Sequence, residues 1–207
     1  MIGLSARMRR FLLSLLLFVV PGPGFGSTIL VLGDSISAGY GLENPDLGWV
    51  GLMGEKLKKR RSGVAVVNAS ISGETSFGGI ARIDSLLSRH KPAILILELG
   101  ANDGLRGLSP ARMQANLGEI IMRAKAAGAR VLLLGMRIPP NYGKRYAEMF
   151  SGVYPALARQ QGATLVPFLM EGVGGRDHLM QGDGLHPNGE AQPILLQRVW
   201  EKLEPML

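Results

Sequence analysis

The sequence predicts an α/β protein: a three-layer α/β/α sandwich around a five-stranded parallel sheet, of the flavodoxin-like kind. Two observations predict this fold class. Five short apolar runs alternate along the chain with longer segments in which apolar residues recur at helical spacing. Each connection between these runs is long enough for a helical crossover, which parallel strands require. Because such crossovers are right-handed, we expect helices on both faces and the strand order 2-1-3-4-5.

The apolar runs give the expected strands, and the segments between them give the helices. Ser109 followed by Pro110 is typical of a helix start, and Gly128 suits the position just past the end of that helix. The expected strands are residues 28–32, 64–67, 93–97, 131–134 and 163–166. The expected helices lie around residues 49–57 and 80–87, at 110–127, at 145–160, and from near Asn188 to the C-terminus.

The first 26 residues differ from the rest and have the layout of a secretory signal peptide. Arg7, Arg9 and Arg10 form a basic start, and residues 11–20 are an uninterrupted apolar run. A membrane anchor is the alternative, but ten residues of helix span only about 15 Å against about 30 Å of bilayer hydrocarbon. We therefore expect residues 1–26 to be a cleaved signal peptide and the protein to be periplasmic or secreted.

Residues 27–207 are expected to form one domain, with no stable membrane anchor once the leader is removed. The formal charge falls from +7 to +4, because the leader carries three Arg and no acidic residue. The densest basic run, residues 56–61, ends a helix, where cations complement the helix dipole, and it has no interleaved aromatic residues to stack on bases. The sequence therefore predicts no nucleic-acid partner, and nothing in it suggests more than a monomer.

Ser35 is a candidate nucleophile, in the fragment Gly-Asp-Ser-Ile-Ser that follows the first strand. Ligands of such sheets bind beyond the carboxyl ends of the strands, where this fragment lies. Taken alone, the fragment is also an ordinary turn with a helix cap. It does not match the Gly-x-Ser-x-Gly elbow of α/β-hydrolases, so that topology is not expected.

Asp183 and His186 are the candidate orienting acid and general base. A spacing of three residues across a turn can bring the carboxylate to Nδ1 of the imidazole, which leaves Nε2 free to face a nucleophile. The alternative is a polar turn with solvated side chains. The other two histidines fit less well, since His90 lies at a helix end and His178 has its acidic neighbour directly beside it.

An oxyanion that develops at Ser35 needs hydrogen-bond donors. Gly73 follows the second strand and offers a backbone N–H, while Asn102 follows the third and offers a side-chain amide. With the N–H of Ser35 they would make a three-donor oxyanion hole. The alternatives are a turn glycine and an Asn that bonds its own turn.

These four fragments together resemble the SGNH/GDSL hydrolase family, whose hallmark residues are Ser, Gly, Asn and His. The matching fragments are GDSIS, ASISGETS, LGAND and DGLHPN, so Ser35, Gly73, Asn102 and His186 correspond in order. Ala101 departs from the pattern, because relatives often have a second Gly there. The resemblance implies a serine hydrolase of acyl esters, thioesters and lysophospholipids that uses no metal and no cofactor.

Residues at the edge of the expected site are candidates for contact with the substrate. Leu105, Leu108, Ile138 and Tyr142 are expected to line an acyl-chain groove, with core packing as the alternative for each. Glu98 is a candidate anchor for the loop that carries Asn102, and Arg137 is its candidate ionic partner. Equally, the two residues could form a plain surface or structural pair.

Two other functions remain open from the sequence. One is a carbohydrate O-deacetylase, which the resembling family also includes, although only 6% of residues are aromatic and no sugar-binding platform is evident. The other is an exported binding protein with a degenerate site. The presence of every catalytic residue type argues against this second alternative.

Overall fold

The computed structural model describes residues 28–207, so the predicted signal peptide lies outside the described part of the chain. Five parallel strands form one sheet in the order β2-β1-β3-β4-β5, which confirms the predicted fold class and strand order. The strands are β1 (Thr28–Gly33), β2 (Ala65–Asn68), β3 (Ile94–Glu98), β4 (Arg130–Leu134) and β5 (Thr164–Val166).

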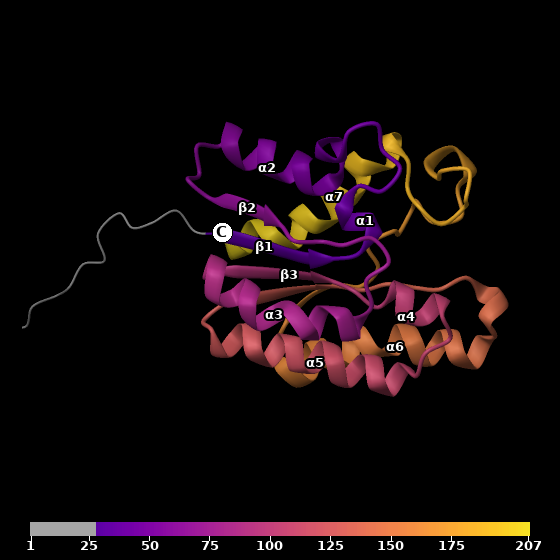
Figure 1. Cartoon of the computed structure of the whole chain (residues 1–207). Helices are drawn as coiled ribbons and strands as arrows, with labels where there is room; N and C mark the ends of the chain where they lie inside the picture. Colours follow the sequence, from indigo (N-terminus) through magenta and orange to yellow (C-terminus); the bar gives the residue numbers. More distant parts are fainter. Residues whose placement is uncertain (1–27) are drawn as a thin grey trace, which may run out of the picture.

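Helices cover both faces of this sheet. Figure 1 shows α2 and α7 on one face and α3, α5 and α6 on the other, with short α1 and α4 at one end. The helices are α1 (Ser35–Ala38), α2 (Trp49–Lys59), α3 (Ser76–His90), α4 (Ala101–Leu105), α5 (Pro110–Ala126), α6 (Lys144–Gln161) and α7 (Gln192–Leu203). No helix within residues 28–207 is both long enough and apolar enough to cross a bilayer.

The two central strands, β1 and β3, form the middle of the hydrophobic core. Residues 29–32 of β1 and 95–97 of β3 are fully buried. Such a side chain stabilises the folded state by about 1.5–3 kcal/mol relative to its exposed form. Burial on both faces explains why these runs show no polar alternation in the sequence. The centre of the sheet is therefore a rigid base for the loops at its carboxyl end.

The structure differs from expectation at the ends of short elements. The last helix was expected near Asn188, but the chain first makes a 3₁₀ turn over Gly189–Ala191 and α7 begins at Gln192. The Asn188 side chain explains the turn, because its Oδ1 accepts the N–H groups of Glu190 and Ala191. Helices α1 and α4 were not predicted, since four or five residues are too few to show a helical period.

The strand register brings the polar loops together. Gly33 at the end of β1 lies opposite Glu98 at the end of β3. The turn after β1 and the turn after β3, which becomes α4, therefore leave the sheet side by side. Parallel sheets of this kind place their ligand sites at such a switch point between strands.

Candidate active site

Ser35 is held at the start of α1 by a tight turn. The Asp34 side chain caps this short helix by accepting the N–H of Ile36 at 3.1 Å, and Gly39 ends it in a left-handed conformation. Ser35 is largely buried, with 9% of its surface exposed, and it lines the cavity described below. The Ser35 N–H donates no hydrogen bond within residues 28–207. The turn therefore presents both an Oγ and a free backbone donor.

The predicted nucleophile, base and acid form one hydrogen-bonded chain. Nε2 of His186 lies 2.8 Å from Oγ of Ser35, and Nδ1 of His186 lies 2.6 Å from Oδ2 of Asp183. This is the orientation that the spacing of Asp183 and His186 predicts. In this arrangement the imidazole can accept the serine proton while the carboxylate holds the ring.

The loop that carries Asp183 and His186 is closed on itself. Oδ1 of Asp183 accepts the N–H groups of His186 at 3.0 Å and Leu185 at 2.9 Å. These bonds, with the one from the imidazole, lower the pKa of Asp183 to about 2. The carboxylate is therefore ionised at neutral pH. The Tyr40 ring packs on the imidazole, with 4.7 Å between the ring centroids.

Gln181 joins this loop to Tyr40, in the segment that follows Ser35. Sequence reasoning missed this role. Its backbone N–H donates to the His186 carbonyl at 2.8 Å. Its side-chain Nε2 donates to the Tyr40 carbonyl at 2.8 Å and to the Pro187 carbonyl at 3.1 Å. A single Gln in a Gly-rich stretch gives no sequence signal for such a role, because its partners come from distant parts of the chain.

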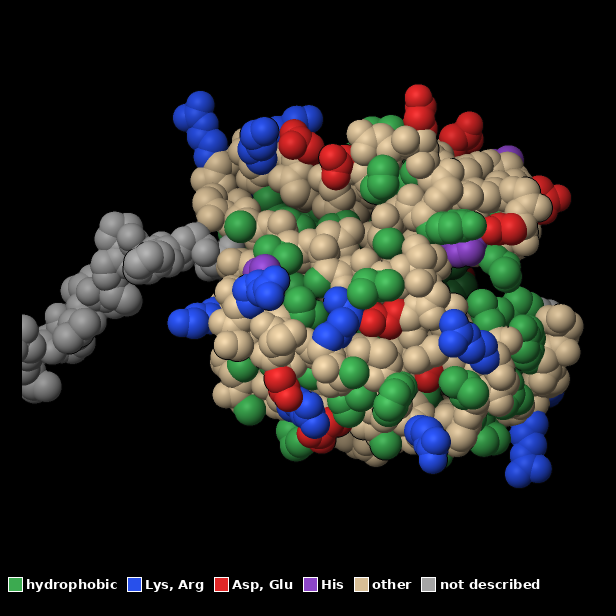
Figure 2. Space-filling model, in the orientation of Figure 1, with side chains coloured by type: hydrophobic (Ala, Val, Ile, Leu, Met, Phe, Trp, Pro, Cys, Tyr) green, Lys and Arg blue, Asp and Glu red, His purple; other side chains and the backbone are tan. Residues whose placement is uncertain are grey.

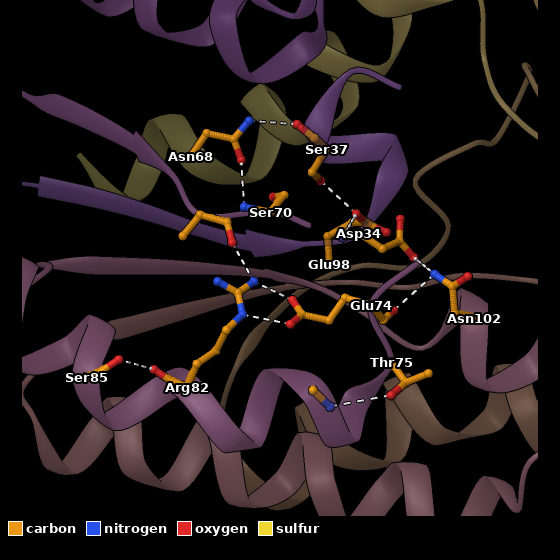
Figure 3. Close-up of polar contacts among 12 residues, drawn as sticks. Asp34, Ser37, Asn68, Ser70, Glu74, Thr75, Arg82, Ser85, Glu98 and Asn102 are labelled. Carbon is orange, nitrogen blue, oxygen red and sulfur yellow. Dashed lines mark hydrogen bonds and ion pairs between the residues drawn. The ribbon is translucent and has the colours of Figure 1, made fainter. Parts of the chain in front are cut away.

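Asn102 lies on α4 beside the turn that carries Ser35, and its amide already donates two hydrogen bonds. Nδ2 donates to Oδ2 of Asp34 at 3.1 Å and to the Glu74 carbonyl at 3.0 Å (Figure 3). An amide nitrogen carries two hydrogens. Asn102 can therefore bind an oxyanion only by sharing or exchanging one of these two bonds.

Gly73 and Glu74 belong to the loop between β2 and α3. Gly73 has a φ of +79°, a left-handed conformation that favours glycine, and its N–H donates no hydrogen bond within the described residues. Its carbonyl accepts a bond from Nη2 of Arg106 at 2.9 Å. Gly73 is not among the residues that line the cavity described below.

Arg82 clamps this loop from α3. Its Nε donates to Oε1 of Glu74 at 2.7 Å, its Nη2 pairs with the other Glu74 oxygen, and Nη2 also donates to the Ala69 carbonyl (Figure 3). The Glu74 side chain is only 7% exposed, so this bidentate ion pair is largely shielded from solvent. The loop is thereby fixed on both sides of Gly73.

Glu98 anchors the turn that carries Ser35, and the suggested pairing with Arg137 is wrong. Oε2 of Glu98 accepts the N–H of Asp34 and the hydroxyl of Ser37. Arg137 instead stacks on Phe168 at 4.7 Å and lies 3.8 Å from Glu171 at the surface. The two cannot meet because Glu98 is fully buried below the turn, whereas Arg137 lies at the mouth of the cavity.

A cavity of about 500 Å³ leads away from the Ser35 hydroxyl. Ser35, Asn102 and His186 line its polar end. Figure 2 shows a hollow on the right of this face, with a His side chain at its rim and hydrophobic side chains below it. The apolar wall includes Leu105, Met136, Ile138, Phe168, Met170 and Met180.

The four residues expected to contact the substrate separate into two pairs. Leu105 and Ile138 line the cavity. Leu108 and Tyr142 are not among the lining residues and are 44% and 37% exposed. Tyr142 Oη donates to the Leu105 carbonyl at 2.9 Å, so it supports the cavity wall from outside. Within residues 28–207, no group of three His, Cys, Asp or Glu side chains is arranged to hold a metal ion.

A parallel α/β/α sandwich with Ser, Gly, Asn and His at its strand ends defines the class of the SGNH hydrolases. The chain belongs to the GDSL-like lipase/acylhydrolase family, whose model matches residues 31–193. This confirms the resemblance seen in the sequence and the predicted kind of enzyme, an acyl hydrolase of the esterase and thioesterase type.

Characterised relatives extend the comparison. The chain is 52% identical to esterase TesA of Pseudomonas aeruginosa, over 97% of this chain and 100% of the relative. It is 45% identical to thioesterase 1/protease 1/lysophospholipase L1 of Escherichia coli, over 87% and 85%. The psychrotrophic esterase EstA of Pseudoalteromonas sp., in a structure inhibited by monoethylphosphonate, has the same fold. Its TM-score is 0.82 at 42% identity, over 86% of this chain and 97% of that chain.

Proposed function

We propose that this enzyme hydrolyses acyl esters and thioesters with Ser35 as nucleophile, His186 as general base and Asp183 as the acid that orients it. The observation that carries the proposal is the chain of two short hydrogen bonds from Ser35 through His186 to Asp183. This chain lies at the polar end of an apolar cavity, where an acyl group would place its carbonyl beside the serine.

The reaction proceeds in two steps through an acyl-enzyme. Oγ of Ser35 attacks the carbonyl carbon as its proton passes to Nε2 of His186, and the imidazolium then protonates the leaving alcohol or thiol. Water next gives a proton to Nε2 and attacks the acyl-serine, and the imidazolium returns a proton to Oγ of Ser35 as the carboxylic acid leaves. Asp183 stays ionised throughout and stabilises the imidazolium, in keeping with its lowered pKa.

The developing oxyanion is stabilised by the N–H of Ser35, the N–H of Gly73 and the amide of Asn102. The first two have no acceptor within the described residues, which supports their role. Asn102 turns one amide hydrogen from its present acceptor to the oxyanion as charge develops there. Hydrogen-bond donors directed at the developing charge in a partly buried site are what acyl transfer requires.

The substrates are small acyl esters, thioesters and lysophospholipids. The largely apolar cavity wall supports an acyl chain as the bound portion. The names of the relatives, an esterase and a thioesterase/lysophospholipase, agree with this range. A carbohydrate O-deacetylase is the competing outcome, which acetylated sugars test directly.

We further propose that the enzyme acts after export as a monomer, with residues 1–26 removed. The basic and apolar pattern of those residues supports export. N-terminal sequencing of the protein recovered from the periplasm or medium tests the cleavage, and a cytoplasmic, uncleaved product would contradict it. Light scattering of the purified enzyme tests the monomer.

Replacement of the serine tests the proposed reaction. Ser35→Ala should abolish hydrolysis of p-nitrophenyl acyl esters, while the melting temperature stays close to that of the wild type. Ser85→Ala, on the exposed face of α3, is the matched control and should keep full activity. A phosphonate ester should lose its leaving group to Ser35, so the peptide that contains Ser35 should gain the mass of the phosphonyl group. Retained activity in a folded Ser35→Ala protein would refute the assignment.

Acyl-chain length decides among the substrates. A series of p-nitrophenyl esters and acyl-CoA thioesters of increasing chain length, with lysophospholipids and acetylated sugars alongside, gives kcat/KM for each class. Preference for the longer chains would support the thioesterase and lysophospholipase activities. Preference for acetyl groups on sugars would replace them with deacetylation.

A further inference from the structure

Glu98 is a fully buried acid that the mechanism above does not use. It ends β3 and lies beside Gly33, the last residue of β1. A Cβ on Gly33 would lie 2.7 Å from Oε2 of Glu98 and 2.7 Å from Oγ of Ser37. Gly33 therefore leaves the room in which the Glu98 carboxyl reaches the nucleophile turn.

Only one of the two Glu98 oxygens has an ordinary donor. Oε2 accepts the N–H of Asp34 at 3.2 Å and the hydroxyl of Ser37 at 2.7 Å (Figure 3). Oε1 is buried and receives no hydrogen bond within residues 28–207. Buried carboxylate oxygens normally have donors, so this one calls for a physical explanation.

No cation balances Glu98 in the described part of the chain. Lys, Arg and His side chains form no ion pair with it. The titratable groups that face it are Asp34, from the turn after β1, and Tyr154, from α6, whose Oη donates to the Leu99 carbonyl. An ionised Glu98 would therefore be a buried charge beside a second carboxyl group.

We infer that Glu98 is protonated and acts as a positioning residue, donating its acid hydrogen to the Asp34 carboxylate. This inference rests on the proposed roles of Ser35 and Asn102. The Glu98 and Asp34 side chains lie within hydrogen-bond reach of each other, and two carboxyl groups can share a hydrogen bond only when one of them carries a proton. Burial and the neighbouring charge of Asp34 raise the pKa of Glu98 well above its ordinary value, in agreement with a neutral acid.

Glu98 and Asp34, here called the acid pair, are connected by hydrogen bonds to the proposed oxyanion hole. Glu98 holds Asp34, and Oδ2 of Asp34 accepts the amide of Asn102. Oδ1 of Asp34 accepts the N–H of Ile36, so both of its carboxyl oxygens are acceptors and the single negative charge of the pair lies on Asp34. A second charge on Glu98 would oppose the oxyanion that forms at Ser35, because like charges in a low-dielectric site repel strongly. Protonated Glu98 thus orients the site without adding charge.

A neutral isostere separates a protonated from an ionised Glu98. In Glu98→Gln the amide can donate to Asp34 while its carbonyl accepts from Asp34 N–H and Ser37 Oγ, as the acid does. Glu98→Ala can neither donate to Asp34 nor accept its N–H. It should lower kcat by about 10- to 100-fold, because the donors of the proposed oxyanion hole are misplaced, and KM should change little. Gln should restore at least about tenfold of that loss, because it replaces the same hydrogen bonds. Glu119→Gln, at the surface of α5, is the matched control.

The pH profile and infrared spectrum complete the test. Wild-type kcat should fall at alkaline pH as Glu98 ionises, and Glu98→Gln should lack that decline. The wild type should also show the carbonyl band of a protonated carboxylic acid at neutral pH, absent from Glu98→Gln and present in Glu119→Gln. A Gln variant as impaired as the folded Ala variant, or a wild type without the band, would overturn the inference. The band is independent of activity, so its absence would leave the role of Ser35 intact.

Discussion

Nε2 of His186 lies 2.8 Å from Oγ of Ser35, although 151 positions separate the two residues in the chain. Asp183 fixes the far side of the imidazole, and Gln181 ties the loop of His186 to the segment that follows Ser35. His186, the proposed general base, is therefore in place before a substrate binds. In the proposed mechanism, catalysis depends on how well the protein holds this geometry.

Asp183→Asn should lower kcat by about 10⁴-fold, as the equivalent change does in serine proteases, because an amide favours the wrong imidazole tautomer. KM should change little, since Asp183 does not line the cavity. Steady-state kinetics with a p-nitrophenyl ester measure both constants. Asp177→Asn, in a surface 3₁₀ turn, is the control. A loss no larger than in that control would show that Asp183 does not orient the base.

Asn102→Ala should lower kcat by about 10²- to 10³-fold through loss of one oxyanion donor. The loss should appear in kcat rather than KM, because the donor acts on charge that develops only in the transition state. Asn44→Ala, which removes an exposed helix cap, is the control. An unchanged kcat would show that the Asn102 amide stays on Asp34 and Glu74 throughout the reaction.

Arg82→Ala should lower kcat by about 10- to 100-fold, because the loop of Gly73 and Glu74 is no longer held in place. Two proposed oxyanion donors would then shift: the N–H of Gly73 and the Asn102 amide, which bonds the Glu74 carbonyl. Added guanidinium should restore part of the activity by occupying the site of the lost side chain. Arg123→Ala, which breaks two ion pairs at the surface, with Asp84 and with Glu119, should show neither effect. Loss of activity without rescue, in a variant with lowered thermal stability, would indicate a general destabilisation.

Leu105→Trp should shorten the acyl chain that the enzyme accepts. Leu105 lines the cavity, and a larger ring there would fill part of its volume of about 500 Å³. The expected result is a rise in KM for long-chain esters with short-chain esters little affected. Leu108→Trp, outside the lining residues, is the matched control. Equal effects on all chain lengths would place the acyl chain elsewhere.

The acid pair should make the wild type less stable than Glu98→Gln as the pH rises. Both carboxyl groups have raised pKa values in the folded state, with Asp34 at about 6. Their favourable contribution is complete below their ordinary pKa values, near about 4, and is lost as the pH rises through the folded values. Urea unfolding at several pH values gives the free energy of unfolding of each protein. A difference that stays constant with pH would contradict the proposed protonation.

Much of the fold and of the geometry of the proposed triad could be predicted from the sequence. Apolar runs define the strands because a buried parallel strand tolerates few polar residues, and the Asp183–His186 spacing is a local property of one turn. The supporting residues could not be predicted in the same way. Tyr142 has the aromatic side chain expected of a groove residue. It lies outside the cavity, however, where its hydroxyl donates to the Leu105 carbonyl.

The sequence by itself determined the strands, the family and the residues at each strand end, because hydrophobic periodicity and turn chemistry are short-range properties. The sheet order was predicted from the right-handed crossovers that join those strands. The tertiary structure decided which side chains meet across the sheet. It brought Glu98 beneath Asp34 rather than to Arg137, since the register of β1 and β3 and the missing side chain of Gly33 direct that carboxyl inward. Such contacts depend on packing between distant segments, which no local pattern encodes.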